Sequence, residues 1–183
     1  MYERRDVIKS KEAIKSAFLR ACWSKDIRKI TVTEIINTAN VSRGTFYAHF
    51  DDIYDLREKI ENEIIELIFS NACSKDIQDI IENPLPVVSS IFLSFYENAD
   101  TIRKLMGKQK DYSFFFKCEQ RLLNILAQSD DYFSDDLKRH VIDNCVTGII
   151  IKNCYNFIIN DENNEQVKKA AELVSEFIYK AVH

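Results

Sequence analysis

The sequence is poor in the residues that interrupt helices, because only three glycines and two prolines occur among its 183 residues. In a helix interior these residues cost roughly 1 and 3 kcal/mol relative to alanine. Isoleucine, leucine, lysine and glutamate are abundant by contrast. We therefore expect an almost entirely helical, all-α protein, long enough to bury a real core in one domain or two small ones.

Cysteine is sparse as well, and its five positions contain no C-x-x-C pair. An odd number without close spacing argues against a disulfide framework and against a zinc site. We expect no bound metal and buried free thiols at Cys22, Cys73, Cys118, Cys145 and Cys154.

Neither a signal peptide nor a membrane span is found. The first residues lead into no apolar segment of signal-peptide length. The most apolar run, Thr147–Ile151, ends at Lys152, far short of a span. A soluble, cytoplasmic protein without membrane contact is the expectation.

Catalytic motifs are missing too. The sequence has no G-x-S-x-G elbow, P-loop, dinucleotide fingerprint or H-E-x-x-H pair. Its three histidines, His49, His140 and His183, lie far apart. We therefore expect neither an enzyme nor a cofactor.

The net charge of −4 is divided unevenly along the chain. Residues 1–50 carry ten Lys/Arg and five Asp/Glu, whereas residues 51–183 carry fifteen and twenty-four. A basic head on an acidic body attracts phosphate locally and keeps the rest of the protein away from it. Chance asymmetry is the alternative interpretation.

The segment Thr31–Phe50 has the pattern of a helix-turn-helix. Thr31 and Glu34 predict a capping box for a first short helix, whose apolar residues recur at i, i+3, i+4 and i+7. Asn40 tolerates the left-handed conformation where that helix ends. Ser42 is a good cap for a second short helix.

The second helix, from Ser42 to His49, has two different faces. Phe46 and Phe50 lie four residues apart and point inward. Because a glycine costs roughly 1 kcal/mol in a helix, Gly44 indicates that something approaches the backbone closely. DNA is one candidate, and packing against a preceding helix over residues 6–23 is the other. The residues left pointing outward are Arg43, Gly44, Thr45, Tyr47 and His49.

The rest of the chain predicts further helices, about nine in all. Asp51 and Asp52 open a long helix that reaches about Ser70 and is shared between the head and a helical body. We place the boundary at its start, with residues 1–52 as a helix-turn-helix DNA-binding domain and residues 53–183 as a regulatory and dimerisation domain. The body is expected to contain a break at Asn71–Pro86, helices near 87–96, 101–106 and 112–128, a loop at Ser129–Ser134, and two long C-terminal helices.

The two C-terminal helices are so apolar that they must be covered on more than one side. Paired with a second copy they would form a four-helix bundle, which predicts a homodimer. Core packing within a monomer is the alternative. The candidate interface residues are Val141, Cys145, Ile149, Val167, Ala171, Val174, Phe177 and Ile178.

The helix-turn-helix resembles the DNA-binding domain of the TetR family of transcriptional regulators. The matching residues are Ile30-Thr31-Val32-Thr33-Glu34-Ile35, then Ala39 through Phe50 with the signature V-S-R-G-T-F-Y-x-H-F, and Leu56 in the next helix. The resemblance implies a three-helix head on a helical body. It also implies a homodimer, most simply a repressor, that binds a palindromic double-stranded DNA operator and releases it when an effector changes the spacing of the heads.

The resemblance also implies roles for residues in this head. Arg43 would read bases, since its fork matches the two major-groove acceptors of guanine, and Ser42, Gly44 and Thr45 would lie against the groove. Phosphates would be held by hydroxyl, imidazole and helix-start groups, at Thr31, Thr33, Tyr47 and His49.

The effector is expected to be an unknown small molecule, apolar or aromatic, bound in the body. An aromatic set at helical spacing could line its pocket, although such residues are equally suited to a core. The candidates are Phe92, Phe95, Tyr96, Tyr112, Phe115, Phe116 and Cys118.

Two positions depart from the usual family pattern. Asn40 replaces a glycine, which is tolerable for the reason given above. Ile53, behind two aspartates, replaces a lysine that would contact phosphate, so DNA affinity would be modest or depend on Lys25, Arg28 and Lys29.

Alternative functions are an activator, a regulator controlled by a protein partner, and a non-specific DNA-structuring protein.

Overall fold

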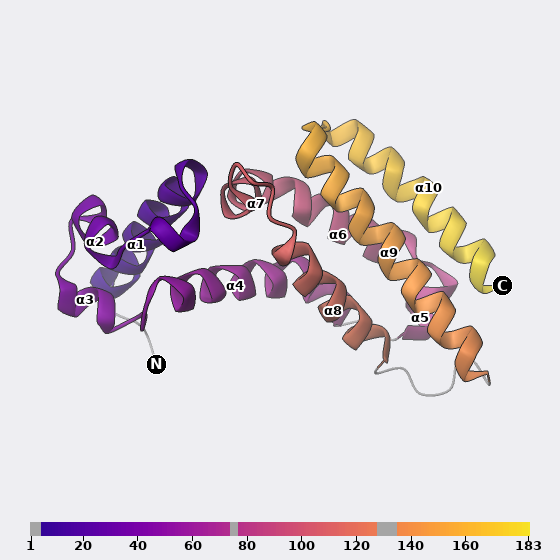
Figure 1. Ribbon diagram of the computed structural model, residues 1–183. Coiled ribbons are helices and arrows are strands. Elements are labelled where there is room, and N and C mark those ends of the chain that lie inside the picture. Colours follow the sequence, from indigo (N-terminus) through magenta and orange to yellow (C-terminus); the bar gives the residue numbers. More distant parts are fainter. Residues whose placement is uncertain (1–4, 74–76, 128–134) are drawn as a thin grey trace. The chain divides into compact units, whose positions relative to one another are not determined.

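The protein is all-α in the part of the chain that its computed structural model describes, which is residues 5–73, 77–127 and 135–183. These residues form ten α-helices and one short 3-10 helix, and no strand (Figure 1). The predicted fold class is confirmed. Within the same residues, no helix is long and apolar enough to cross a membrane.

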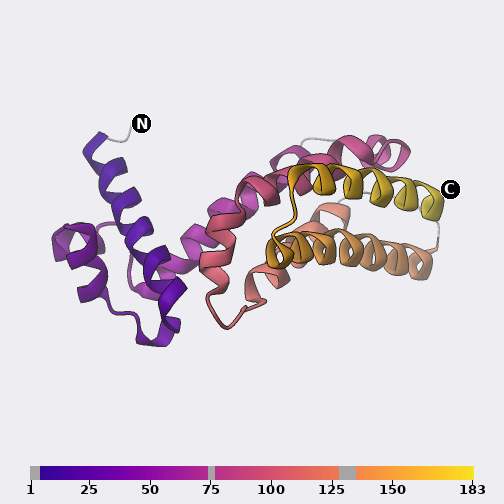
Figure 2. The same cartoon turned by 90° about the horizontal axis from the view of Figure 1, so that it is seen from above.

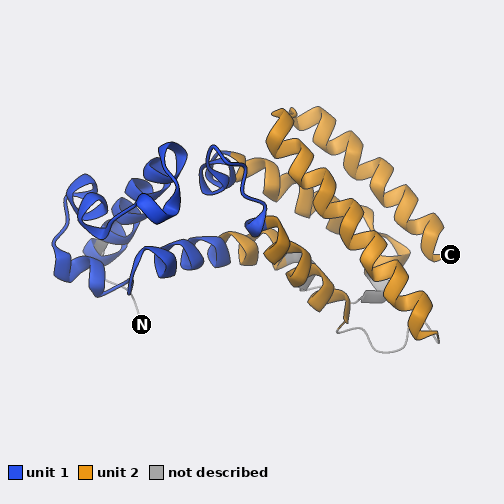
Figure 3. Ribbon diagram, viewed as in Figure 1, with its two compact units in different colours: residues 1–63, 100–114 blue, residues 64–99, 115–183 orange. Residues whose placement is uncertain are grey.

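The chain forms two compact units (Figure 3). Unit 1 comprises residues 1–63 and 100–114, and unit 2 comprises residues 64–99 and 115–183. The predicted boundary at residue 52 does not coincide with the division into compact units, and as a boundary between functions it stays a prediction. Residues 100–114, which the sequence assigned to the body, belong to the same compact unit as the helix-turn-helix.

Unit 1 is built around α1 (Arg5–Ser24), the 3-10 helix η1 (Ile27–Lys29), α2 (Val32–Ala39) and α3 (Arg43–Tyr47). It also contains the first half of α4 (Ile53–Cys73), all but the first residue of α7 (Ala99–Met106), and the turn that follows α7. α1 buries Ile14 and Phe18 completely, and Ile35, Phe46 and Leu56 complete the same core.

Unit 2 contains the rest of α4, α5 (Ile77–Glu82), α6 (Leu85–Glu97) and most of α8 (Ser113–Ala127). It is completed by α9 (Asp136–Asn160) and α10 (Asn164–Val182), which lie side by side in both views (Figures 1 and 2). α10 contacts α5, α6 and α9, and α6 also contacts α9. A complete capping box starts α10, since the side chains of Asn163 and Gln166 each accept the other's backbone N–H.

The predicted break at Asn71–Pro86 is wrong for most of its length. α4 continues to Cys73, and α5 and the start of α6 occupy Ile77–Glu82 and Leu85 onward. Pro84 and Pro86 stand at the very start of α6, where a missing N–H costs little. The prolines therefore begin a helix instead of interrupting one. The predicted loop Ser129–Ser134 lies outside the described residues.

Three of the predicted buried thiols are confirmed and one is wrong. Cys22, Cys118 and Cys154 are buried and form no disulfide among the described residues, whereas Cys145 is exposed on α9. Cys145 is one helical turn from Val141, and both side chains are exposed, so the part of the chain that the structure describes does not cover this face of α9. The side chain of Cys73 is outside the described part.

Candidate nucleic-acid interface

α2 begins as predicted at Thr31, but only half of the capping box is present. Thr31 Oγ1 accepts from the backbone N–H of Glu34 at 3.2 Å. The Glu34 carboxylate instead accepts from Lys25 Nζ at 2.7 Å. An ion pair to the segment before η1 has thus replaced the reciprocal bond, and Lys25 is already engaged within the chain.

The turn between α2 and α3 has the predicted conformation. Asn40 is left-handed, with φ 53° and ψ 48°, and the N–H of Val41 donates to Ile36 O at 3.1 Å. Ser42 Oγ then accepts from the N–H of Thr45 at 3.0 Å, which caps α3. The backbone of Asn40 thus ends α2, and the side chain of Ser42 starts α3.

α3 is anchored from one side and open on the other. Phe46 is fully buried and Phe50 nearly so, as predicted, and their rings lie 5.7 Å apart. Tyr47 packs edge-on against Phe46 and is exposed. Of the other outward residues, Arg43 and Gly44 are exposed, while Thr45 and His49 are half-buried.

The two helices are joined on their exposed side by a bond between predicted site residues. Arg43 Nη2 on α3 donates to Thr33 Oγ1 on α2 at 3.2 Å. Both side chains are exposed. The bond restricts the guanidinium to the α2 side of α3 and leaves its other nitrogens available to an acceptor outside the chain.

Gly44 is not required by packing inside the protein. A Cβ added there would lie 3.7 Å from Ser42 Oγ, an ordinary van der Waals distance, with no closer neighbour among the described residues. The alternative that Gly44 packs against α1 is therefore wrong. Close approach to Gly44 by a molecule outside the chain stays a prediction.

The start of α4 is occupied by its own carboxylates. Asp52 Oδ1 accepts from the N–H groups of Tyr54 and Asp55, both at 2.8 Å. The N–H of Asp51 donates to Asp55 Oδ2 at 2.9 Å. Ile53 is buried. Carboxylates of the chain itself therefore occupy the positive end of α4. Ile53, at the position where the family usually has a lysine, is part of the core.

A lysine that the sequence analysis did not single out lies beside this site. Lys59 Nζ donates to the backbone carbonyl of His49 at 2.9 Å and to Asp55 Oδ2 at 2.8 Å. It also lies 5.5 Å from the centre of the Phe50 ring. Lys59 thus fixes the end of α3 to α4. The four-residue spacing from Asp55 was the only signal of this role in the sequence.

Arg28 near the helix-turn-helix is also paired within the chain. It donates to both carboxylate oxygens of Asp26, from Nε at 3.0 Å and from Nη2 at 2.6 Å. These bonds from Arg28 hold the pKa of Asp26 well below its usual range. Of the three cations expected to assist DNA binding, Lys25 and Arg28 thus have acidic partners, and Lys29 is exposed.

The aromatic residues predicted to line an effector pocket are separated by the fold. Phe92, Phe95, Phe115 and Cys118 are fully buried in unit 2. Phe95 stacks on Phe115 at 5.7 Å between ring centres, and Phe92 meets Phe157 edge-on at 5.0 Å. These rings fill a core. The remaining candidates, Tyr96, Tyr112 and Phe116, are exposed.

The predicted interface residues also divide into two groups. Val167, Ala171, Val174 and Ile178 are buried within unit 2, because this stripe of α10 faces the core of its own chain. Ile149 is half-buried. The exposed group is Val141, Cys145 and Phe177, and Leu137 and Leu173 are exposed beside them on the same helices.

No family model matches the sequence, but the fold is found in solved structures of transcriptional regulators. A protein of Syntrophomonas wolfei described as a TetR-family regulator has a TM-score of 0.70 and 17% identity, over 96% of this chain and 95% of that chain. The dihydroxyacetone kinase operon activator DhaS has a TM-score of 0.65 and 21% identity, over 96% and 97%. The TetR-family repressor AlkX from a Dietzia strain has a TM-score of 0.53 and 16% identity, over 94% and 98%. The chain therefore has a TetR-type fold along nearly its whole length.

Proposed function

We propose that this chain is a DNA-binding transcriptional regulator of the TetR family, which recognises a palindromic operator as a homodimer. The observation that carries the proposal is the open face of α3, on which Arg43 is exposed and bonded to Thr33. Arg43 reads a base, most simply guanine. Gly44 allows the backbone to approach the groove, with Ser42 and Thr45 beside it.

The phosphate contacts come from residues around this face. Thr31, Thr33, Tyr47 and His49 present hydroxyl and imidazole groups near the starts and ends of α2 and α3. Such contacts position a protein on the duplex and carry no sequence information. Because carboxylates occupy the start of α4, total affinity is modest and specificity depends on Arg43.

Homodimerisation uses the uncovered faces of α9 and α10. Val141 and Cys145 on α9 and Phe177 on α10 are exposed, and a second copy would cover them in a four-helix arrangement. Two heads are then held apart by a fixed distance. This distance must match one turn of DNA, about 34 Å, or a multiple of it.

The direction of regulation is proposed as repression, relieved by a small-molecule effector. Activation is a second candidate, because one of the structures with this fold is described as an operon activator. A transcription assay on the identified operator distinguishes the two. If the controlling factor is a protein instead of a small molecule, the particle mass in light scattering would increase when that protein is added.

The proposal is tested by selecting binding sites for the full chain from a library of random DNA duplexes. We expect enrichment of an inverted repeat whose half-sites lie about 10 base pairs apart or a multiple of that. Light scattering of the free protein should give twice the mass of one chain. A DNA-structuring protein would bind without enriching any motif, and that result would refute sequence-specific recognition.

A further inference from the structure

Unit 1 contains a cavity of about 220 Å³ that lies apart from the surface proposed to read DNA. It is bounded by the end of α1, by η1, by α4, and by the turn that connects α7 to α8. All of its lining residues belong to unit 1. The cavity therefore adjoins the helix-turn-helix within one compact unit.

The wall formed by the α7–α8 turn is closely fitted to α1. Gly107 ends α7 with φ +60°, and a Cβ there would lie only 3.0 Å from the backbone oxygen of Cys22. The N–H of Asp111 donates to Met106 O at 3.0 Å, which closes the turn. Across the cavity, Gln109 Nε2 donates to Asp26 Oδ2 at 3.3 Å. The walls are thus held by bonds that do not need a ligand.

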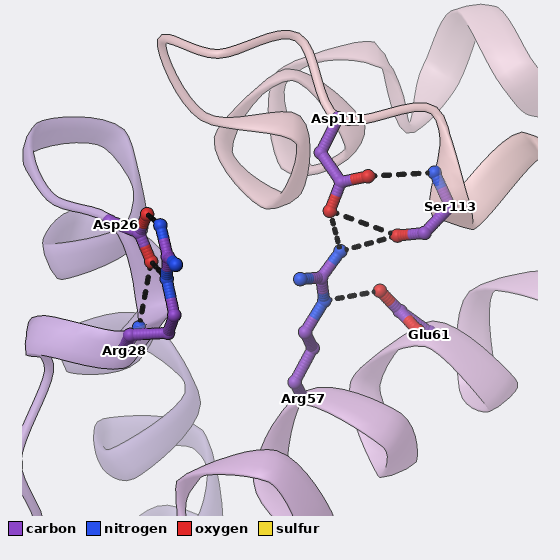
Figure 4. Close-up of polar contacts among 6 residues, drawn as sticks. All are labelled: Asp26, Arg28, Arg57, Glu61, Asp111 and Ser113. Atoms are coloured by element: carbon purple, nitrogen blue, oxygen red, sulfur yellow. Dashed lines mark hydrogen bonds and ion pairs between the residues drawn. The ribbon is translucent and has the colours of Figure 1, made fainter.

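Arg57 presents a positive group to this space from a fixed position (Figure 4). Its Nε donates to Glu61 Oε1 at 2.6 Å, and its Nη2 donates to Asp111 Oδ2 at 2.9 Å and to Ser113 Oγ at 2.8 Å. Glu61 is only 2% exposed. Nη1 has no partner among the described residues, and in Figure 4 it points toward the side on which Asp26 lies.

The two carboxylates that line the cavity already accept hydrogen bonds, whereas Arg57 Nη1 donates none among the described residues. The Asp26 carboxylate accepts from Arg28 and Gln109, and the Asp111 carboxylate accepts from Ser113 and Arg57. Lys108, on the α7–α8 turn, lines the cavity and is exposed. Because Nη2 already donates to Asp111 and Ser113, a ligand would meet single donors, Arg57 Nη1 and Lys108 Nζ. Charge-assisted hydrogen bonds to a carboxylate are stronger than those to a neutral oxygen, so a small carboxylate suits these two cations.

The size and the remaining wall limit the ligand further. A volume of about 220 Å³ lies below the roughly 300–1,000 Å³ of ordinary ligand pockets, so the site suits a small molecule. Burial raises the pKa of the Cys22 thiol to about 12, so this wall is neutral and unreactive.

We propose that this cavity binds a small carboxylate through Arg57 and Lys108, and that it is the effector site of the regulator. The second part rests on the function proposed above. A carboxylate there would contact α4 and the α7–α8 turn beside the end of α1, which supports the helix-turn-helix. It changes operator affinity to the extent that it binds the DNA-bound and free arrangements differently.

The three glycines allow the site to be tested directly in the full chain. Gly107 lines the cavity, Gly44 is on α3 and Gly148 is on α9, so ¹⁵N-glycine labelling gives one amide signal for each region. Succinate is the probe, and succinamide is its neutral counterpart of the same shape. We expect succinate to shift the Gly107 signal saturably, with a dissociation constant of about 1 mM or lower, while succinamide leaves it unchanged.

Two variants and one control identify the binding groups. Arg57→Lys keeps the charge but removes the Nη1 donor, and we expect at least tenfold weaker binding of succinate. Lys108→Gln changes an exposed residue that carries little risk to the fold, and binding should weaken several-fold. Lys110→Gln removes an exposed lysine from the same turn that does not line the cavity, and it should bind succinate like the wild type.

The possible failures are distinguishable. If Gly107 does not respond to succinate, or if succinamide binds equally well, the carboxylate site is refuted. If all three glycine signals move together, a general effect of added anion replaces a specific site. Operator DNA should shift Gly44 in the same sample. If succinate does not shift the Gly107 signal while operator DNA shifts the Gly44 signal, the effector site is refuted and the proposed DNA-binding function is not.

Discussion

Arg43 Nη2 donates to Thr33 Oγ1 at 3.2 Å, so the residue proposed to read bases is held by the helix that precedes it. An arginine side chain loses considerable rotamer freedom when it is fixed on DNA. A bond already present in the free protein reduces that loss. Under the proposed function, Thr33 would therefore contribute to recognition through Arg43 as well as through its own proposed phosphate contact.

Removing either partner of this bond should affect binding to different extents. Arg43→Ala is expected to weaken binding to the selected operator by about 1–3 kcal/mol and to broaden specificity at one base pair. Thr33→Ala should cost less, about 0.5–1.5 kcal/mol, because only one hydrogen bond is lost. Competition gel shifts at fixed salt measure both effects.

Thr38→Ala is the matched control for these variants, since Thr38 is also exposed on α2 and is not a proposed site residue. Its affinity should equal that of the wild type, and thermal unfolding should change little for all three variants. An Arg43→Ala protein with unaltered affinity and specificity would disprove the base-reading role.

The left-handed Asn40 should determine how stable the helix-turn-helix is. Asn40→Ala places a Cβ-bearing residue without a compensating amide at φ 53°, and we expect a loss of about 1 kcal/mol in unfolding free energy. Asn40→Gly should be neutral or slightly stabilising, because glycine adopts this conformation without strain. Urea unfolding compares the two, and equal stability of both variants would contradict the assigned role of the turn.

The two aspartates before α4 should have separable effects. Asp52 caps the helix through two hydrogen bonds, so Asp52→Ala should destabilise the protein by about 1 kcal/mol. The Asp51 side chain makes no comparable cap, and Asp51→Asn removes a negative charge close to the proposed DNA surface. It should raise operator affinity at low salt while leaving stability unchanged.

The salt dependence of binding tests this separation. Repulsion between Asp51 and phosphate is screened at higher ionic strength, so the advantage of Asp51→Asn should shrink as salt increases. A gain that is independent of salt would point to a cause other than charge.

Local structure could be predicted from the sequence wherever the contacts that fix it join residues close together along the chain. Asn40 and Ser42 end and start helices through contacts within three to five residues, and both were correctly assigned. The pairing of Lys25 with Glu34 was not foreseen, because it depends on how η1 folds back beside α2. In the helix-turn-helix, the prediction from sequence fails where a side chain from another segment, here Lys25, binds the same carboxylate.

Unit 2 shows the same limit on a larger scale. The stripe of α10 that includes Val167 and Val174 was recognised as apolar, but periodicity cannot tell a core from an interface. In the structure this stripe is buried within unit 2, where α10 contacts α6 and α9, so it belongs to the core. The cavity at Gly107 could not be predicted from the sequence either, because its lining residues extend from Cys22 to Asp111, more than eighty positions apart.

The ion pair between half-buried Arg57 and buried Glu61 gives a further prediction. Arg57→Met removes the guanidinium from which Glu61 Oε1 accepts at 2.6 Å, and we expect a loss of about 1–3 kcal/mol in unfolding free energy. The double variant Arg57→Met with Glu61→Met removes both charges and should recover most of that loss. Urea unfolding of the single and double variants measures the difference. A double variant as unstable as the single would show that Glu61 is not the source of the penalty.

Because residues 100–114 return to unit 1 after residues 64–99 have entered unit 2, no single cut in the chain separates the two units. A fragment ending at residue 52 would lack the buried side chains of Leu56 and Ile60, together with the turn at Gly107. Unit 1, which carries the proposed DNA-binding surface, therefore cannot be transferred to another protein as one contiguous segment. A hybrid that preserves unit 1 must transplant two stretches at once, and α3 is then always transferred together with the turn at Gly107 that closes the cavity.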